Sequence, residues 1–220
     1  MNILRQLTEK SWETPGAPSL ASDAAARSLA LPAPSVGLRV FLAVVGVLFS
    51  LLIVVYAERM LYEDWRPAPQ QWLLWVNTGL LVASSIAFQW AWVSVRRGRL
   101  DATKIGLVTA GLFAAAFLVG QLLAWEQLSA MVVFDITNPA IAFFYMITAL
   151  HGLHMLGGLV AWGRTMLVFW RRPDPARVQL RVRLCATYWH FLLVIWLLLF
   201  GLLFSGNDNL NFLLTICGLR

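Results

Sequence analysis

The sequence predicts an all-α fold, namely a polytopic membrane protein with five transmembrane helices. Hydrophobic residues make up 60% of the 220 residues and charged residues only 13%, against roughly 45–50% and about 25% in ordinary soluble domains. A soluble globule of this size needs more polar surface than these residues supply. The composition therefore excludes a soluble enzyme, a disordered chain and a disulfide scaffold.

The apolar residues gather in five runs, each close to the ~20 residues that an α-helix needs to cross the hydrocarbon core. The second run, WLLWVNTGLLVASSIAFQWAWV, contains no ionisable side chain. Helix is the expected state of such open spans, because lipid offers no partner to unpaired backbone groups. The predicted spans cover residues 37–57, 72–95, 105–125, 140–163 and 184–204.

Basic residues are unevenly distributed, and this predicts the orientation in the membrane. The N-terminal arm up to Arg39, together with the second and fourth loops, holds 14 of the 17 Lys and Arg residues. Because basic residues stay on the cytoplasmic side, the N-terminus is predicted to be cytoplasmic and the C-terminus periplasmic, as an odd number of spans requires. The same topology explains the net charge of +6 without nucleic-acid binding.

The chain is predicted to have three parts. Residues 1–36 contain several prolines and no apolar run as long as a signal-peptide core, which indicates a flexible cytoplasmic N-terminal arm. Residues 37–205 form the five-helix transmembrane bundle. Residues 206–220 form a short outer-side tail, because their apolar stretch is too short to cross a bilayer.

Three histidines are the chief candidates for a functional site, since ionisable groups inside a membrane are costly. His151 and His154 are three residues apart and so share one face of the fourth span, and His190 lies in the fifth span. One interpretation is a metal or haem site built by these two spans. The other is that the imidazoles hydrogen-bond to neighbouring helices and hold them together.

Lipid contacts are predicted at both ends of the spans. Arg164, Arg171 and Arg172 follow the fourth span on the cytoplasmic side, where they either hold lipid phosphates or only set the topology. Trp125 and Glu126 close the third span on the outer side, at headgroup depth. Glu126 is interpreted as an interfacial solvated acid, with a polar anchor or proton-handling carboxylate as the alternative. No predicted span interior contains Asp, Glu, Lys or Arg, which counts against a transporter or proton pump.

Two stretches resemble helices of cytochrome c oxidase subunit III. FFYMITALHGLHMLGGLVAW (143–162) resembles the helix of that family with a "H-G-x-H" centre, and TYWHFLLVIWLLLFGLLF (187–204) resembles its last helix, which reads like "YWHFVDVVWLFLF". QLLAWE (121–126) is similar to the family's "Q-x-x-E-W" region, with Trp and Glu exchanged. Five spans match the short bacterial form, which lacks the first two of seven helices.

Two departures from this family pattern indicate a divergent branch. The stretch FLAVVGVLF (41–49) has no acid, and Val45 falls near the position of the family's buried glutamate. Leu193 stands where the last-helix motif has aspartate. The absence of an acid at both positions argues against a role in supplying protons to the catalytic subunit.

The resemblance implies an accessory, non-redox subunit of a bacterial haem-copper oxidase in the inner membrane. Such a subunit binds no haem or metal of its own, contributes no catalytic residue, packs beside catalytic subunit I, and holds phospholipid. The haem and copper are expected in partner subunits of a complex that reduces oxygen with electrons from cytochrome c or quinol and translocates protons. His151, His154, Tyr188 and His190 are predicted to form a polar cluster that joins the fourth span to the fifth.

Two alternatives remain open. The loss of both acids is also consistent with a subunit III-like accessory protein of nitric oxide reductase. The histidines alone are consistent with an independent membrane protein that binds about one metal ion or haem through His151, His154 and His190.

Overall fold

The computed structural model describes residues 33–62, 65–66, 71–131, 138–171 and 175–204, without the side chains of Arg171 and Pro175. The chain divides after Arg39 into two units, and the contacts described below belong to the second, Val40–Arg220. The predicted tail lies outside the described residues, as does the predicted arm except for residues 33–36, which are helical.

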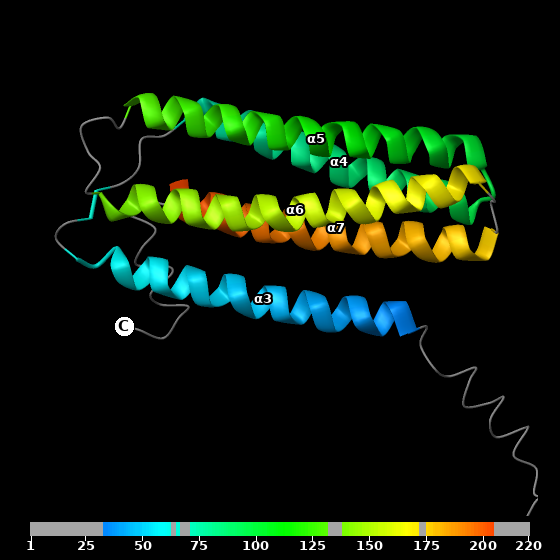
Figure 1. The fold of residues 1–220 in the computed structure, drawn as a ribbon, viewed down its shortest axis with the longest axis horizontal. Helices are drawn as coiled ribbons and strands as arrows, with labels where there is room; N and C mark the ends of the chain where they lie inside the picture. Colours follow the sequence, from blue (N-terminus) through cyan, green and yellow to red (C-terminus); the bar gives the residue numbers. More distant parts are fainter. Residues whose placement is uncertain (1–32, 63–64, 67–70, 132–137, 172–174, 205–220) are drawn as a thin grey trace, which may run out of the picture. The chain divides into compact units, whose positions relative to one another are not determined.

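Five helices make up the described part of the chain (Figure 1). They are α3 (Ala33–Arg59), α4 (Trp72–Arg96), α5 (Leu100–Met131), α6 (Pro139–Arg171) and α7 (Pro175–Phe204). All five are long and apolar enough to cross a membrane, and no described residue lies in a strand. The predicted all-α fold with five spans is therefore confirmed, whereas the orientation of the termini stays a prediction.

The helices extend beyond the predicted apolar runs. A helix ends where a cap or a turn satisfies its last backbone groups, and this need not be the residue at which hydropathy falls. The predicted third span ended at residue 125, which placed Glu126 directly after it. Helix α5 continues to Met131, so Glu126 lies inside the helix. Helix α6 begins where Asn138 Oδ1 accepts the N–H of Ala140 at 3.0 Å and Pro139 occupies the first helical position, which suits its fixed φ.

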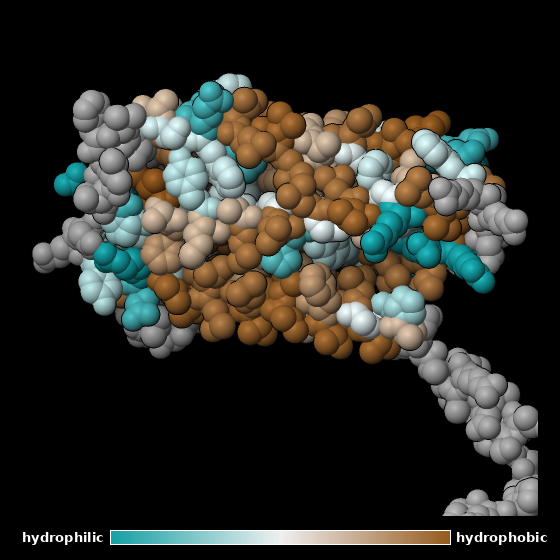
Figure 2. Space-filling view, viewed as in Figure 1, coloured by the Kyte–Doolittle hydropathy of each residue, from teal (hydrophilic) through white to brown (hydrophobic). Residues whose placement is uncertain are grey.

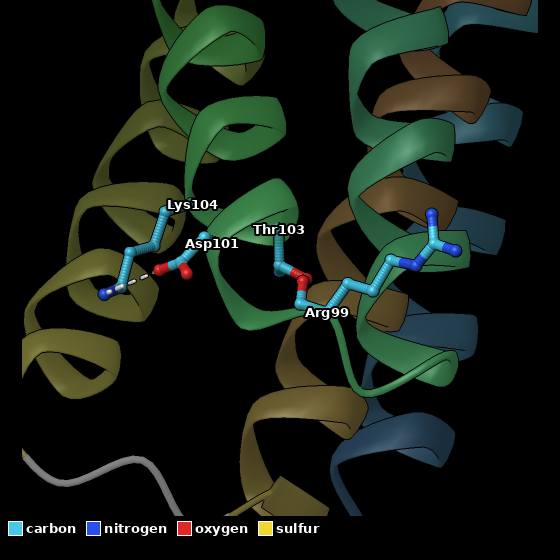
Figure 3. A network of polar contacts seen from close by, with 4 residues as sticks. All are labelled: Arg99, Asp101, Thr103 and Lys104. Carbon is cyan, nitrogen blue, oxygen red and sulfur yellow. Dashed lines mark hydrogen bonds and ion pairs between the residues drawn. The ribbon is translucent and has the colours of Figure 1, made fainter.

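A tight turn joins α4 to α5. Gly98 adopts φ 69°, a left-handed conformation that glycine enters without steric cost. Beyond the turn, Thr103 Oγ1 donates to the Arg99 carbonyl at 2.8 Å, and Lys104 lies 3.7 Å from Asp101 (Figure 3). Asp101 stands in the first turn of α5, where a negative charge suits the helix dipole. These contacts stabilise the exposed end of the α4–α5 hairpin.

Small residues let the helices approach closely, as is usual where lipid supplies no hydrophobic drive to association. A Cβ on Gly106 of α5 would lie 2.9 Å from the Ala91 Cβ of α4, and Ser84 of α4 donates to the Ala110 carbonyl at 2.8 Å. A Cβ on Gly158 of α6 would lie 2.6 Å from the Tyr188 ring of α7. At Gly106 the backbones of α4 and α5 thus approach each other directly, and at Gly158 the backbone of α6 packs against an aromatic side chain of α7.

Aromatic side chains fill the space between these pairs and α3. Trp189 and Trp196 of α7 are at most 1% exposed, and Trp196 Nε1 donates to Thr78 Oγ1 of α4 at 2.9 Å. Phe49 of α3 is fully buried, in a cluster that includes Ile147 of α6 and Leu199 of α7. The face over α5 and α6 presents a broad hydrophobic band to the outside (Figure 2), as expected for a surface that meets lipid.

Candidate functional site

Tyr188 and His154 connect α7 to α6. The Tyr188 hydroxyl donates to the His154 backbone carbonyl at 2.7 Å, and the His154 ring nitrogen Nδ1 lies 2.8 Å from the Leu150 carbonyl oxygen. The rings of Phe49 and Phe41 on α3 lie 5.5 and 6.3 Å from the His154 ring, between centroids. The side chain of His154 is therefore held by its own helix and by aromatic neighbours.

His151 is fully buried at the meeting point of four helices. Its ring lies 5.1 Å from Trp196 of α7, 5.9 Å from Phe117 of α5 and 6.2 Å from Phe49 of α3. Neither ring nitrogen has a hydrogen-bond partner within the described part of the chain. His151 thus contributes an imidazole to an aromatic core and no hydrogen bond to a neighbouring helix.

His190 contacts α4 rather than α6. Its Nδ1 shares a short hydrogen bond with the Ser85 hydroxyl, and its Nε2 lies 3.0 Å from Gln89 Oε1. Because the Gln89 carbonyl oxygen only accepts, Nε2 carries the proton of a neutral ring, and Nδ1 then accepts from Ser85. The structure therefore brings Tyr188 to α6 and His190 to α4.

The three histidines do not converge on one point. Within the described ranges, no group of three or more His, Cys, Asp or Glu side chains is placed to hold a metal ion. Phe49 contacts the rings of both His151 and His154, whereas His190 contacts Ser85 and Gln89 of α4. Among the described residues, the geometry thus offers no set of three ligands for the independent metal site considered above. A haem site and the role of the polar cluster stay predictions.

A second polar contact, which the sequence analysis did not single out as a site, joins α4 to α5. Asn77 Nδ2 donates to Gln121 Oε1 at 3.3 Å, and both side chains are buried. Asn77 fits against α5 because Gly120 has no side chain there. In the sequence, Gln121 begins the QLLAWE stretch, whereas Asn77 is marked only as an amide inside a span.

An open apolar cleft of about 260 Å³ lies between α5 and α6. At one end Trp125 Nε1 donates to Thr148 Oγ1 at 3.0 Å, and the Tyr145 hydroxyl donates to the Trp125 carbonyl at 3.1 Å. The cleft is lined by Leu118, Gln121, Leu122, Trp125, Thr148, Ala149, Gly152, Leu153 and Leu156. Its walls are almost wholly hydrocarbon, so the cleft suits an apolar chain.

The five residues predicted to contact lipid do not share one site. Trp125 lines the cleft, and Glu126 beside it is exposed. Arg164 is exposed near the other end of the α5–α6 pair, two residues after Trp162, whose Nε1 donates to the Leu107 carbonyl at 2.9 Å. The side chain of Arg171 and all of Arg172 lie outside the described residues. Lipid contact at these positions stays a prediction.

Val45, which stands near the position of the family's glutamate, is 2% exposed and belongs to the apolar cluster with Phe49 and Ile195. An unpaired carboxylate there would be costly, since the surrounding side chains supply no charged partner. Leu193 on α7 is only partly buried. Apolar side chains of the described helices thus surround Val45.

The fold and the site define a multi-pass helical membrane protein whose intramembrane polar groups connect helices. The model of the family "Cytochrome c oxidase subunit III" matches residues 66–206. The chain belongs to this family.

Several relatives are named as subunit 3 of a cytochrome c or ubiquinol oxidase. A cytochrome c oxidase subunit 3 of Thermostichus vulcanus is 30% identical over 176 residues, covering 76% of this chain and 85% of that protein. A probable cytochrome c oxidase subunit 3 of Mycobacterium tuberculosis is 27% identical over 179 residues, covering 77% and 86%. A cytochrome bo(3) ubiquinol oxidase subunit 3 of Pseudomonas aeruginosa is 26% identical over 129 residues, covering 59% and 62%. The resemblance seen in the two histidine-bearing spans is therefore confirmed.

Proposed function

We propose that the chain is the non-redox accessory subunit of a bacterial haem-copper terminal oxidase, located in the inner membrane beside catalytic subunit I. The observation that carries the proposal, together with family membership, is the placement of the histidines. His154 and His190 are engaged in hydrogen bonds within the bundle, and His151 is enclosed by aromatic rings. In this proposal, haem and copper belong to partner subunits, and this chain binds neither.

The complex would reduce oxygen and translocate protons, with electrons from cytochrome c or quinol. The relatives support both donors, because their names include a cytochrome c oxidase and a ubiquinol oxidase. The contribution of this chain is assembly and stability. Three interhelical hydrogen bonds support that role, from Tyr188 to α6, from Trp196 to α4 and from Trp125 to α6.

Phospholipid binding is the second part of the proposal. The cleft between α5 and α6 offers apolar walls to an acyl chain, and Trp125 is one of the residues that line it. An indole ring is favourable at headgroup depth. Glu126 follows Trp125 in sequence, and its exposed carboxylate suits a cationic part of a lipid headgroup. Arg164, near the opposite end of the α5–α6 pair, suits a lipid phosphate.

Affinity purification of this chain from native membranes in mild detergent tests the proposal. Mass spectrometry of the eluate identifies co-purified chains, and a reduced-minus-oxidised optical spectrum reports their haem. The expected result is a catalytic subunit of an oxygen reductase together with its haem signal. A colourless chain that elutes alone would contradict the proposal.

A nitric oxide reductase accessory protein is the second candidate, and one observation favours it. Val45 is enclosed by apolar side chains and Leu193 replaces the other acid, so neither position offers a carboxylate to a proton-translocating partner. The same purification separates the candidates, because nitric oxide reductase chains with b-type haem would then replace the oxygen reductase.

A further inference from the structure

The hydrogen-bonded pair His190–Gln89 lies deep inside the membrane-spanning part of the bundle. Gln89 is seven residues before Arg96 on α4, and His190 is seven residues after Arg183 on α7. At 1.5 Å per residue, both side chains are about 10 Å from the nearest charged residue of their own helix. Gln89 and His190 therefore lie at the same depth within the hydrocarbon core of the membrane.

This pair is open to the outside of the bundle. Gln89 is exposed and His190 is partly buried. The Gln89 carbonyl oxygen accepts from His190, which leaves the amide nitrogen and its two donors without a partner among the described residues. An unpaired amide facing lipid is costly, because hydrocarbon supplies no acceptor.

Three hydroxyls of α3, α4 and α7 leave no such unsatisfied donor. Ser50, Thr78 and Thr187 each donate to the carbonyl four residues earlier in their own helix, at 2.8 to 3.0 Å. Ser50 and Thr187 are exposed as well, yet their donors are satisfied. Exposure of a polar side chain is thus not enough to leave a donor unsatisfied. Gln89 combines an exposed side chain with unsatisfied amide donors, whereas Gln121, whose Nε2 also lacks a partner among the described residues, is buried.

The surroundings of the pair suit a helix. Ile86 is 64% exposed and Trp90 47% on α4, while Val194 is 54% exposed and Leu197 44% on α7. A Cβ on Gly79, which is exposed two turns before Ile86, would meet no atom within 4 Å. An apolar surface with an open glycine lets another helix approach closely, and the amide fixes its register.

We propose that this α4/α7 face binds a transmembrane helix of another subunit of the same oxidase, and that this helix presents a hydrogen-bond acceptor to the Gln89 amide nitrogen. The face is defined by Ile86, Gln89, Trp90, His190, Val194 and Leu197. The inference rests on the proposed function, which supplies the other subunit.

Photo-crosslinking of the assembled complex tests the occupant directly. p-Benzoylphenylalanine is placed at Ile86 or Val194 of the full chain, and in a matched control at Leu112 of α5, which is 65% exposed. The expected result is an adduct with another oxidase subunit from Ile86 and Val194 and none from Leu112. Adducts with a second copy of this chain, no protein adduct, or equal adducts from Leu112 would overturn the proposal.

A substitution measures the contribution of the amide. Gln89→Leu removes the amide donors, together with the carbonyl oxygen that accepts from His190 Nε2, while keeping the side-chain size. His190 retains its bond to Ser85. We expect about threefold less co-purified partner, the loss that one interhelical hydrogen bond of ordinary strength in a membrane produces. Unchanged recovery would overturn the role given to Gln89.

The two proposals fail in different ways. If the tagged wild-type chain brings down no oxidase subunit, the proposed function fails before the face is tested. If it brings down the oxidase but Ile86 and Val194 give no adduct with it, only the assignment of this face fails.

Discussion

The Tyr188 hydroxyl on α7 donates a 2.7 Å hydrogen bond to the backbone carbonyl of His154 on α6. Gly158 makes this contact possible, because a Cβ there would lie 2.6 Å from Cε1 of the tyrosine ring. The ring is also 6.2 Å from Phe41 of α3, between centroids. One phenol thus joins two helices by a hydrogen bond and reaches the third by packing.

The first prediction concerns this hydroxyl. Tyr188→Phe keeps the ring and removes the donor, so we expect a loss of about 0.6 kcal/mol, and at most about 1.7 kcal/mol, in the free energy of unfolding. Unfolding of the purified chain in mixed micelles, followed by circular dichroism, measures it. Tyr62→Phe is the control, because Tyr62 is 59% exposed. Equal stability of Tyr188→Phe and wild type would show that the bond contributes nothing.

The second prediction separates His190 from His151. His190→Leu leaves buried Ser85 without its partner, at a cost of about 1–3 kcal/mol per orphaned group. We therefore expect less assembled complex, with unchanged turnover per haem in what assembles, and the same direction for His154→Leu. His151→Leu is expected to leave stability unchanged or higher, since no hydrogen bond is lost.

Complex yield and turnover per haem check this prediction. An intact complex with abolished turnover in His190→Leu or His154→Leu would assign that histidine to the chemistry. Destabilisation by His151→Leu as large as by His190→Leu would show that the His151 ring has a polar partner in the assembled complex.

The number of spans and the family could be predicted because both depend on composition and on short motifs. The directions of the three histidines could not. A spacing of three residues leaves about 60° between side chains on a helix of 3.6 residues per turn. That angle is enough to bury His151 completely and leave His154 partly exposed. Which helix His190 meets depends on how α4 packs beside α7, which its own motif does not encode.

The cleft between α5 and α6 could not be predicted from the sequence either. Trp125 was identified as an interfacial residue, and it lines the cleft. Its hydrogen-bond partner Thr148, however, is 23 residues away on another helix. A glycine within a span, such as Gly152, usually indicates a close contact between helices, yet the nearest atom to a Cβ at Gly152 would be Leu118 Cδ2 at 3.9 Å. Glycine spacing alone does not distinguish a close contact from an opening.

The third prediction uses the close contact of α4 with α5. Gly106→Ala would place a methyl group 2.9 Å from the Ala91 Cβ and 3.1 Å from its Cα, and neither atom is the end of a flexible side chain. We expect destabilisation of about 1–3 kcal/mol, as for other overpacked contacts. Gly79→Ala on α4 is the matched control, because a Cβ there would meet no atom within 4 Å. The two variants are compared by thermal unfolding, and equal midpoints would contradict the packing described here.

The last prediction tests lipid in the cleft between α5 and α6. Gly152→Leu places an isobutyl group against the cleft wall beside Leu118 and Thr148, so we expect less phospholipid to remain bound after purification in mild detergent. Gly157→Leu adds the same side chain to the same helix where a Cβ would meet nothing within 4 Å, outside the cleft, and controls for hydrophobicity and helix propensity. Native mass spectrometry counts the retained lipids. Equal retention in the two variants would place the bound lipid elsewhere, whereas selective loss in Gly152→Leu would assign the acyl chain to this cleft, because only there does the added group occupy the space that the chain would fill.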